Sequence, residues 1–198
     1  MNNLILDNFF DDPDEIRKIA LSRYFRYGGN NNGGWKGERT FPLRDYGSTC
    51  PCCQQEINSN FQSEQNFLIE KSEKIFNACK EHYNIDDENI TITSYFHITT
   101  EDTKNSMQYF AQEKFHQDSC LLAGVVYLTP DAPLDAGTSI LCAEENKFVN
   151  IENKYNRLVA YESYRIHALS DSFGTSKDTG RLTFTFFLHN VNDLLEST

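Results

Sequence analysis

The first half of the chain carries apolar positions with a helical period. After a short apolar segment at residues 4–6, Asp11-Asp12-Pro13 predicts a helix over residues 13–24, because proline is favoured in the first helical turn and acidic side chains stabilise its positive end. Apolar residues with helical spacing predict a second helix over residues 64–83. We therefore expect two helices before the sheet region of the chain.

Residues 28–60, between the two predicted helices, fit no regular period. The segment is rich in Gly and Asn around Trp35 and then carries a cluster of cysteines. Irregular segments of this length inside a domain are usually functional or mobile. We interpret the part around Trp35 as a lid or recognition element; the alternative is that Trp35 simply packs over a sheet.

From residue 90 onward, apolar and polar positions alternate as they do in β-strands. Turn residues separate the segments. The predicted strands cover residues 90–98, 123–128, 138–142, 157–161, 165–169 and 181–188. Helices followed by many short strands indicate an α+β protein whose second part is a β-sandwich or barrel. We expect a single domain over residues 1–198, with a helical part and long loop at 1–89 and the sheet core at 90–190.

Composition and charge limit the partners. A chain of 198 residues with 39% hydrophobic content can bury a two-sheet core. The formal net charge of -11 argues against nucleic acid as a partner, because phosphate binding needs a basic surface. No apolar run approaches the roughly 18 residues of a membrane span, and the N-terminus lacks the features of a signal peptide. We expect no membrane partner and a cytoplasmic location.

Cys50, Cys52 and Cys53 crowd into one short stretch, and three further cysteines are scattered. A reducing cytosol would keep them as thiols. A structural zinc site, the alternative, usually needs two spaced Cys/His pairs, and no second pair is visible.

His116, Asp118, His167 and Arg181 stand in an order that points to metal chemistry. Side chains on a strand alternate faces, so His116 and Asp118 point to one side if their segment is extended. Two imidazoles and one carboxylate on one face of an octahedral metal leave three positions open, which suits Fe(II) holding a cosubstrate and O2 together. A cationic side chain beyond the metal can then anchor a dicarboxylic acid.

Each of these residues also has a purely structural interpretation. His167 would suit a buried structural histidine, and Arg181 a surface arginine at a strand start. The polar row of Arg181, Thr183 and Thr185 on the last strand would line a pocket or face solvent. Their joint order, spacing and strand context favour the metal site. The three histidines without a carboxylate at metal spacing are interpreted as structural: His82, His97 and His189.

At these residues the sequence resembles the Fe(II)/2-oxoglutarate-dependent oxygenases, in particular the prolyl-hydroxylase-like branch. The resemblance covers roughly residues 90–190 and implies a double-stranded β-helix (jelly roll) with N-terminal helices packed on one sheet. It implies that Fe(II) is held by His116, Asp118 and His167, and that Arg181 binds the far carboxylate of 2-oxoglutarate.

The resemblance also implies a reaction. Tyr127 and Tyr95 look like tyrosines of the family's cosubstrate pocket, and Thr183 shares the strand face of Arg181. The implied activity is hydroxylation with 2-oxoglutarate and O2, release of succinate and CO2, and ascorbate as a candidate reductant; the presence of Asp118 favours hydroxylation over halogenation. The substrate is a prolyl or peptidyl residue or a small metabolite, and its candidate contacts are Trp35, Arg39 and Arg165.

Two other functions remain open. One is a catalytically inactive jelly-roll or cupin-like module that binds a metal or another ligand, and the other is a cupin-like enzyme that uses a metal without 2-oxoglutarate. Exposed strand edges would permit a homodimer.

Overall fold

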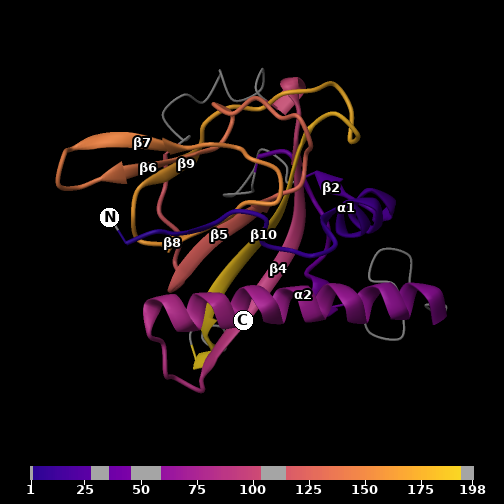
Figure 1. Cartoon of the computed structure of the whole chain (residues 1–198), viewed down its shortest axis with the longest axis horizontal. Helices are drawn as coiled ribbons and strands as arrows, with labels where there is room; N and C mark the ends of the chain where they lie inside the picture. Colours follow the sequence, from indigo (N-terminus) through magenta and orange to yellow (C-terminus); the bar gives the residue numbers. More distant parts are fainter. Residues whose placement is uncertain (1, 28–35, 46–58, 104–114, 193–198) are drawn as a thin grey trace.

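Two antiparallel sheets lie at the centre of the described part of the protein in the computed structural model, which describes residues 2–27, 36–45, 59–103 and 115–192 (Figure 1). In these residues, the larger sheet has the strand order β1 (Leu4–Leu6), β8 (Leu158–Glu162), β5 (Leu122–Tyr127), β10 (Arg181–Asn190), β4 (Ile90–Thr99), β3 (Glu38–Arg39), β2 (Arg26–Tyr27). The smaller sheet has the order β7 (Lys147–Ile151), β6 (Thr138–Cys142), β9 (His167–Leu169).

Strand β10 is the central strand of the larger sheet, and its side chains alternate between the two faces of the sheet. It pairs with β4 from Arg181 opposite Thr99 to Asn190 opposite Ile90, and with β5 on its other side. Its apolar row is buried in the main core: Leu182, Phe184, Phe186 and Leu188. The polar row that begins at Arg181 lies on the opposite face, as strand alternation predicts.

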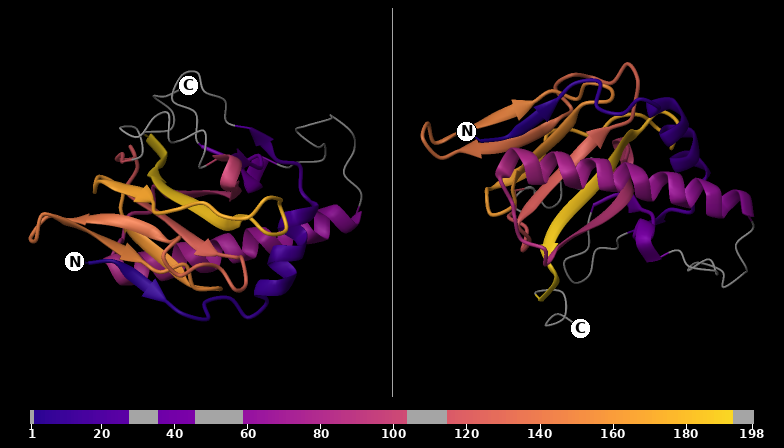
Figure 2. Two further views of the ribbon diagram at one scale, coloured as in Figure 1. Left: turned by 90° about the horizontal axis from the view of Figure 1, so that it is seen from above. Right: turned by 60° about the horizontal axis from the view of Figure 1, so that its bottom comes forward.

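Helices α1 (Pro13–Ser22) and α2 (Ser59–Tyr83) contribute apolar side chains to the main core. Helix α1 begins at Pro13 with acidic residues in its first turn, as predicted, and ends before the extended Arg23. Helix α2 begins earlier than predicted and crosses the larger sheet (Figure 2). A short 3-10 helix, η1 (Leu43–Asp45), lies between them in sequence. No helix within the described segments is both long and apolar enough to cross a membrane.

A second apolar cluster lies between the two sheets. It joins Val125 and Tyr127 of β5 with Ile140 of β6, and includes Val159 and Tyr161 of β8. The smaller sheet is held there through apolar packing. A cavity adjoins this cluster, and it is lined by polar side chains of β9 and β10 that include His167, Arg181 and Thr185.

The structure differs from the sequence-based expectations in three places. Strand β7 was not predicted, because it is an exposed edge strand without an apolar alternation. The predicted strand 165–169 begins only at His167, because a turn follows β8. Strand β3 lies in the stretch expected to be irregular. Trp35 and the cysteine cluster at 50–53 lie outside the described residues, and the described cysteines are free thiols: Cys79, Cys120 and Cys142.

Phe184→Ala should destabilise the protein by about 3–5 kcal/mol, because the change removes a fully buried ring and leaves a cavity. The ring lies 5.2 Å from that of Phe96 and 5.9 Å from that of Phe10, centroid to centroid. Urea unfolding followed by circular dichroism measures the change. Phe148→Ala on the exposed part of β7 is the control and should cost less than about 1 kcal/mol. Equal losses in the two variants would contradict this placement of the core.

Candidate metal centre

Main-chain hydrogen bonds bring the segment of His116 and Asp118 beside the segment of His167. The His116 N–H donates to the His167 carbonyl oxygen at 3.0 Å, and the His167 N–H donates back at 2.9 Å. The Asp118 N–H donates to the Ser163 carbonyl oxygen, also at 3.0 Å. His116 forms only an isolated β-bridge, so the ligands do not stand on one long strand. Pairing between two short segments aligns them instead.

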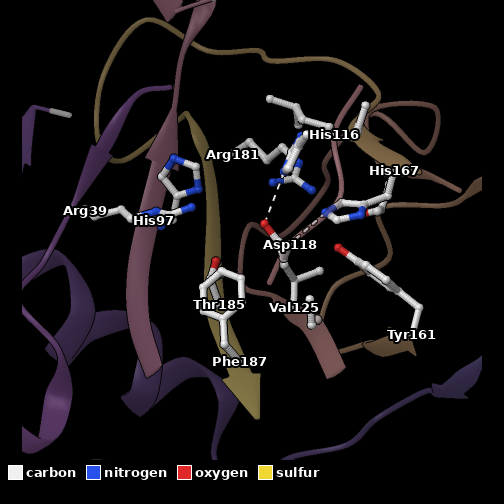
Figure 3. Close-up of a pocket in the computed structure, with 15 residues that line it drawn as sticks. Arg39, His97, His116, Asp118, Val125, Tyr161, His167, Arg181, Thr185 and Phe187 are labelled. Carbon is white, nitrogen blue, oxygen red and sulfur yellow. Dashed lines mark ion pairs between the residues drawn. The ribbon is translucent and has the colours of Figure 1, made fainter. Parts of the chain in front are cut away.

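The three side chains converge on one point (Figure 3). Nε2 of His167 lies 3.2 Å from one carboxylate oxygen of Asp118, and Nε2 of His116 lies 3.6 Å from the other. All three ligand atoms lie within 4.8 Å of one another. Two ligand bonds of about 2.1 Å at a right angle would separate their donor atoms by about 3 Å. The group is therefore suited to hold a divalent metal ion with small adjustments.

His167 is oriented by its own surroundings. Its Nδ1 donates a hydrogen bond to the Arg165 carbonyl oxygen at 2.8 Å, which leaves Nε2 for Asp118 or a cation. The ring is buried and lies 4.7 Å from the ring of Tyr161. Such a backbone partner on the second ring nitrogen fixes the tautomer of metal-binding histidines. The side chain of His116 is about half exposed, at 52%, so this edge of the group faces the opening.

Asp118 is held in its ionised form. Burial is the largest influence and raises the pKa of its carboxyl group. The hydrogen bond with His167 and the electrostatic influence of His167, His116 and Arg39 oppose it, and the pKa ends below its ordinary value. Metal binding needs the carboxylate form, and it is present at neutral pH.

Arg181 lies on the wall of the same cavity and is almost fully buried, at 3% exposure for the residue. Nε donates to the Ala136 carbonyl oxygen at 3.0 Å and Nη2 to that of Gly137 at 3.2 Å. Gly137 lies so close to β7 that a Cβ there would meet the Ile151 carbonyl oxygen at 1.8 Å. A side chain in place of Gly137 would therefore disturb the turn that presents these carbonyls.

The guanidinium of Arg181 offers further donors to the cavity, because it carries five N–H groups. Burial lowers its pKa, but an arginine remains charged in proteins. In the described part of the chain, no carboxylate is among the groups that shift the pKa of Arg181. A buried cation without an acidic partner is unfavourable unless an anion binds. This position can therefore receive a carboxylate.

The other predicted cosubstrate residues lie just behind the cavity wall. The hydroxyl group of Tyr127 lies 2.8 Å from that of Thr138, which lines the cavity, and its ring centroid lies 5.2 Å from Cζ of Arg181. The hydroxyl of Thr183 lies 2.9 Å from that of Thr185, which also lines it.

Tyr95 stands edge-on to Phe187, another lining residue, with ring centroids 6.2 Å apart. The predicted residues therefore contact the cavity wall from behind: Tyr127 contacts Thr138, Thr183 contacts Thr185, and Tyr95 contacts Phe187.

The predicted substrate contacts fall in three different places. Arg39 lines the cavity. Arg165 is directed away from it, because its guanidinium donates to Oδ1 of Asn3 at 2.8 Å and to the Leu141 carbonyl oxygen at 2.9 Å. Trp35 is outside the described residues.

His97, which was expected to be a structural histidine, lines the cavity. Burial, then the charge of Arg39, hold its pKa well below the ordinary value, so the ring is neutral. Its Nε2 lies 2.5 Å from the Lys36 carbonyl oxygen. The sequence could have indicated this position, because His97 follows Tyr95 by two residues in a predicted strand and therefore lies on the same face of that strand.

No family model and no curated protein matches the sequence. Solved structures do match. A prolyl hydroxylase from Trichoplax adhaerens, in complex with a hypoxia inducible factor peptide fragment, has 15% identity and a TM-score of 0.59, over 100% of this chain and 87% of that one. A 2OG-Fe(II) oxygenase family oxidoreductase from Burkholderia pseudomallei has 11% identity and a TM-score of 0.60, over 96% and 87%. A Neurospora crassa protein in complex with alpha-ketoglutarate has 10% identity and a TM-score of 0.57, over 95% and 75%.

These neighbours agree with the antiparallel sheets described above and with the resemblance seen in the sequence. At such low identity the likeness establishes the fold. The chain therefore has the double-stranded β-helix fold of the Fe(II)/2-oxoglutarate oxygenases, in the form that it shares with a prolyl hydroxylase.

Proposed function

We propose that the protein is an Fe(II)- and 2-oxoglutarate-dependent dioxygenase that hydroxylates its substrate, with residues 1–198 forming one catalytic domain. One observation carries the proposal: the group of His116, Asp118 and His167 and the buried guanidinium of Arg181 line the same cavity. The hollow contains about 550 Å³ of empty space, counting its open mouth. A metal site and a carboxylate site in one hollow suit a cosubstrate that binds to both.

Different residues would bind the metal ion and the cosubstrate. The two imidazoles and the carboxylate would hold Fe(II) and leave three positions open. Arg181 would bind the far carboxylate of 2-oxoglutarate through a charge-assisted, two-point contact. Tyr127 stabilises Arg181 from behind through its ring and keeps Thr138 in place. The chemistry that Fe(II) supplies with O2 is conversion of a substrate C–H bond to C–OH, coupled to conversion of 2-oxoglutarate to succinate and CO2.

The other walls of the cavity would exclude part of the water and keep the site residues in place. Val125, Ala123 and Phe187 present apolar surface to the cavity. Apolar walls lower the local polarity and strengthen the contacts of Asp118 and Arg181 with their ligands. The carbonyl oxygen of Arg165 holds His167 in the tautomer that directs Nε2 inward. The site is therefore largely formed before the cosubstrate binds.

The finer assignments are part of the same proposal. The Trichoplax adhaerens neighbour is in complex with a peptide, which supports a peptidyl substrate, with a small metabolite as the alternative. The free thiols of Cys79, Cys120 and Cys142 suit a reducing compartment such as the cytosol. Ascorbate would serve as the reductant that keeps iron in the Fe(II) state.

The direct test is succinate formation from 2-oxoglutarate by purified protein with Fe(II), ascorbate and air. We expect slow turnover without the natural substrate. His116→Ala and Asp118→Ala should abolish it and weaken Mn(II) binding by more than about 100-fold, because each removes a metal ligand. His82→Ala is the control, since its ring lies on the surface against Asn2. Turnover that survives in either ligand variant would refute the assignment.

Arg181→Gln should weaken 2-oxoglutarate binding to the Mn(II)-loaded protein by at least about 30-fold, because the loss of one partner of a buried charge pair costs about 2 kcal/mol or more. Calorimetry without O2 measures the affinity. Arg165→Gln removes an arginine that points away from the cavity, so this control should keep wild-type affinity. Unchanged affinity in Arg181→Gln would refute the assignment of Arg181 as the group that binds the far carboxylate, whereas no binding by the wild type would favour a cupin-like metal protein that does not use 2-oxoglutarate.

A further inference from the structure

Tyr161, near the end of β8, places a hydroxyl group in the wall of the cavity. The residue is almost fully buried, at 4% exposure. In the view of Figure 3 its hydroxyl group points inward, toward Asp118 and His167. Among the residues that the structure describes, this hydroxyl has no hydrogen-bond partner. The cavity therefore contains a hydrogen-bond donor that the binding roles assigned above do not use.

Strand pairing holds Tyr161 in this position. Strand β8 lies beside β5, with Tyr161 opposite Ala123 and Val159 opposite Val125. Residues opposite each other in an antiparallel pair share a face, and all four belong to the apolar cluster between the two sheets. The ring of Tyr161 also packs against that of His167, with 4.7 Å between the ring centroids. The ring is therefore fixed on several sides, and its one polar atom is left at the cavity.

The hydroxyl lies within electrostatic reach of both parts of the candidate site. Burial and then the charge of Asp118 raise the pKa of Tyr161 well above its ordinary value, whereas the charge of Arg181 lowers it. The hydroxyl therefore keeps its proton at neutral pH and can donate a hydrogen bond. Its position suits a ligand that extends from the candidate metal group to Arg181.

The surroundings of the hydroxyl decide what it can bind. A buried donor without a partner is unfavourable, so a ligand that offers an acceptor oxygen at this point is favoured. The hydroxyl points toward Asp118 and His167, so this acceptor would lie at the metal end of the cavity. In the proposed function a carboxylate of 2-oxoglutarate lies there. Hydrogen bonds to an ionised acceptor are stronger than those between neutral groups.

We propose that the hydroxyl of Tyr161 donates a hydrogen bond to the carboxylate of 2-oxoglutarate that lies at the metal. The inference rests on the proposed function and adds one residue to its cosubstrate site. Tyr161 and Arg181 would then each contact one of the two carboxylates. This pair of contacts would fix the direction in which 2-oxoglutarate lies in the cavity.

Tyr161→Phe removes the hydroxyl group and keeps the ring beside His167, so it tests the hydrogen bond alone. Calorimetry without O2 on the Mn(II)-loaded protein measures 2-oxoglutarate binding. We expect about tenfold weaker binding in this variant, because it loses a hydrogen bond to a charged group. The affinity for Mn(II) itself should not change. Tyr155→Phe is the matched control and should keep wild-type affinity, since the Tyr155 hydroxyl donates to Asp14, away from the cavity.

Two truncated ligands locate the contact. Levulinate lacks the carboxylate next to the oxo group, and 2-oxopentanoate lacks the far carboxylate. Ligand-observed NMR on Zn(II)-loaded protein compares them, because Zn(II) is not redox-active. We expect Tyr161→Phe to weaken the binding of 2-oxopentanoate and to leave that of levulinate unchanged.

Unchanged 2-oxoglutarate affinity in Tyr161→Phe overturns the proposal. So does an equal loss for levulinate, because the hydroxyl would then not contact the carboxylate at the metal. Weaker Mn(II) binding in Tyr161→Phe also overturns it, because Tyr161 would then act through His167 and the metal. Failure of the wild type to bind 2-oxoglutarate at all refutes the proposed function instead.

Discussion

The alternation of side chains along β10 is the constraint on which the rest of the structure depends. Hydrogen bonding to β4 and β5 fixes the register of this central strand, so each residue is committed to one face. Phe184 and its apolar neighbours pack into the main core beside the two helices, while Arg181 and Thr185 face the cavity. A slip by one residue would bury the arginine in the core and expose the phenylalanines. Stability and the candidate site therefore rely on the same register.

The candidate metal group depends on a smaller and more local arrangement. His116 and His167 are joined by two main-chain hydrogen bonds, one in each direction. Two positions after His116, the main-chain N–H of Asp118 donates to the Ser163 carbonyl oxygen. This explains how residues far apart in sequence reach one point without a long strand between them. It also leaves the group open on the side of His116, where a cosubstrate and O2 could enter. The buried side, at His167, is the more rigid one because its ring contacts Tyr161 and the Arg165 carbonyl.

Much of this could be predicted from residue order, and the exceptions have physical reasons. The ligand spacing, the position of Arg181 at the start of the last strand and the two helices follow from local patterns. Strand β7 could not be found, because an exposed edge strand has no buried face to impose an alternation. Arg165 was expected to contact the substrate, but it follows a turn after β8 and its guanidinium is directed to Asn3. Arg39 was expected to contact the substrate, but its position opposite His97 depends on the pairing of β3 with β4, which no local pattern reveals.

The central claim is that one cavity binds a metal ion and 2-oxoglutarate together. A crystal structure of the protein grown with Mn(II) and 2-oxoglutarate, with an anomalous map at the manganese edge, tests it most directly. The account predicts a manganese peak bonded to His116, Asp118 and His167, and density for 2-oxoglutarate that reaches from the metal to Arg181. A manganese peak elsewhere, or 2-oxoglutarate absent from Arg181 beside an occupied metal site, would contradict it.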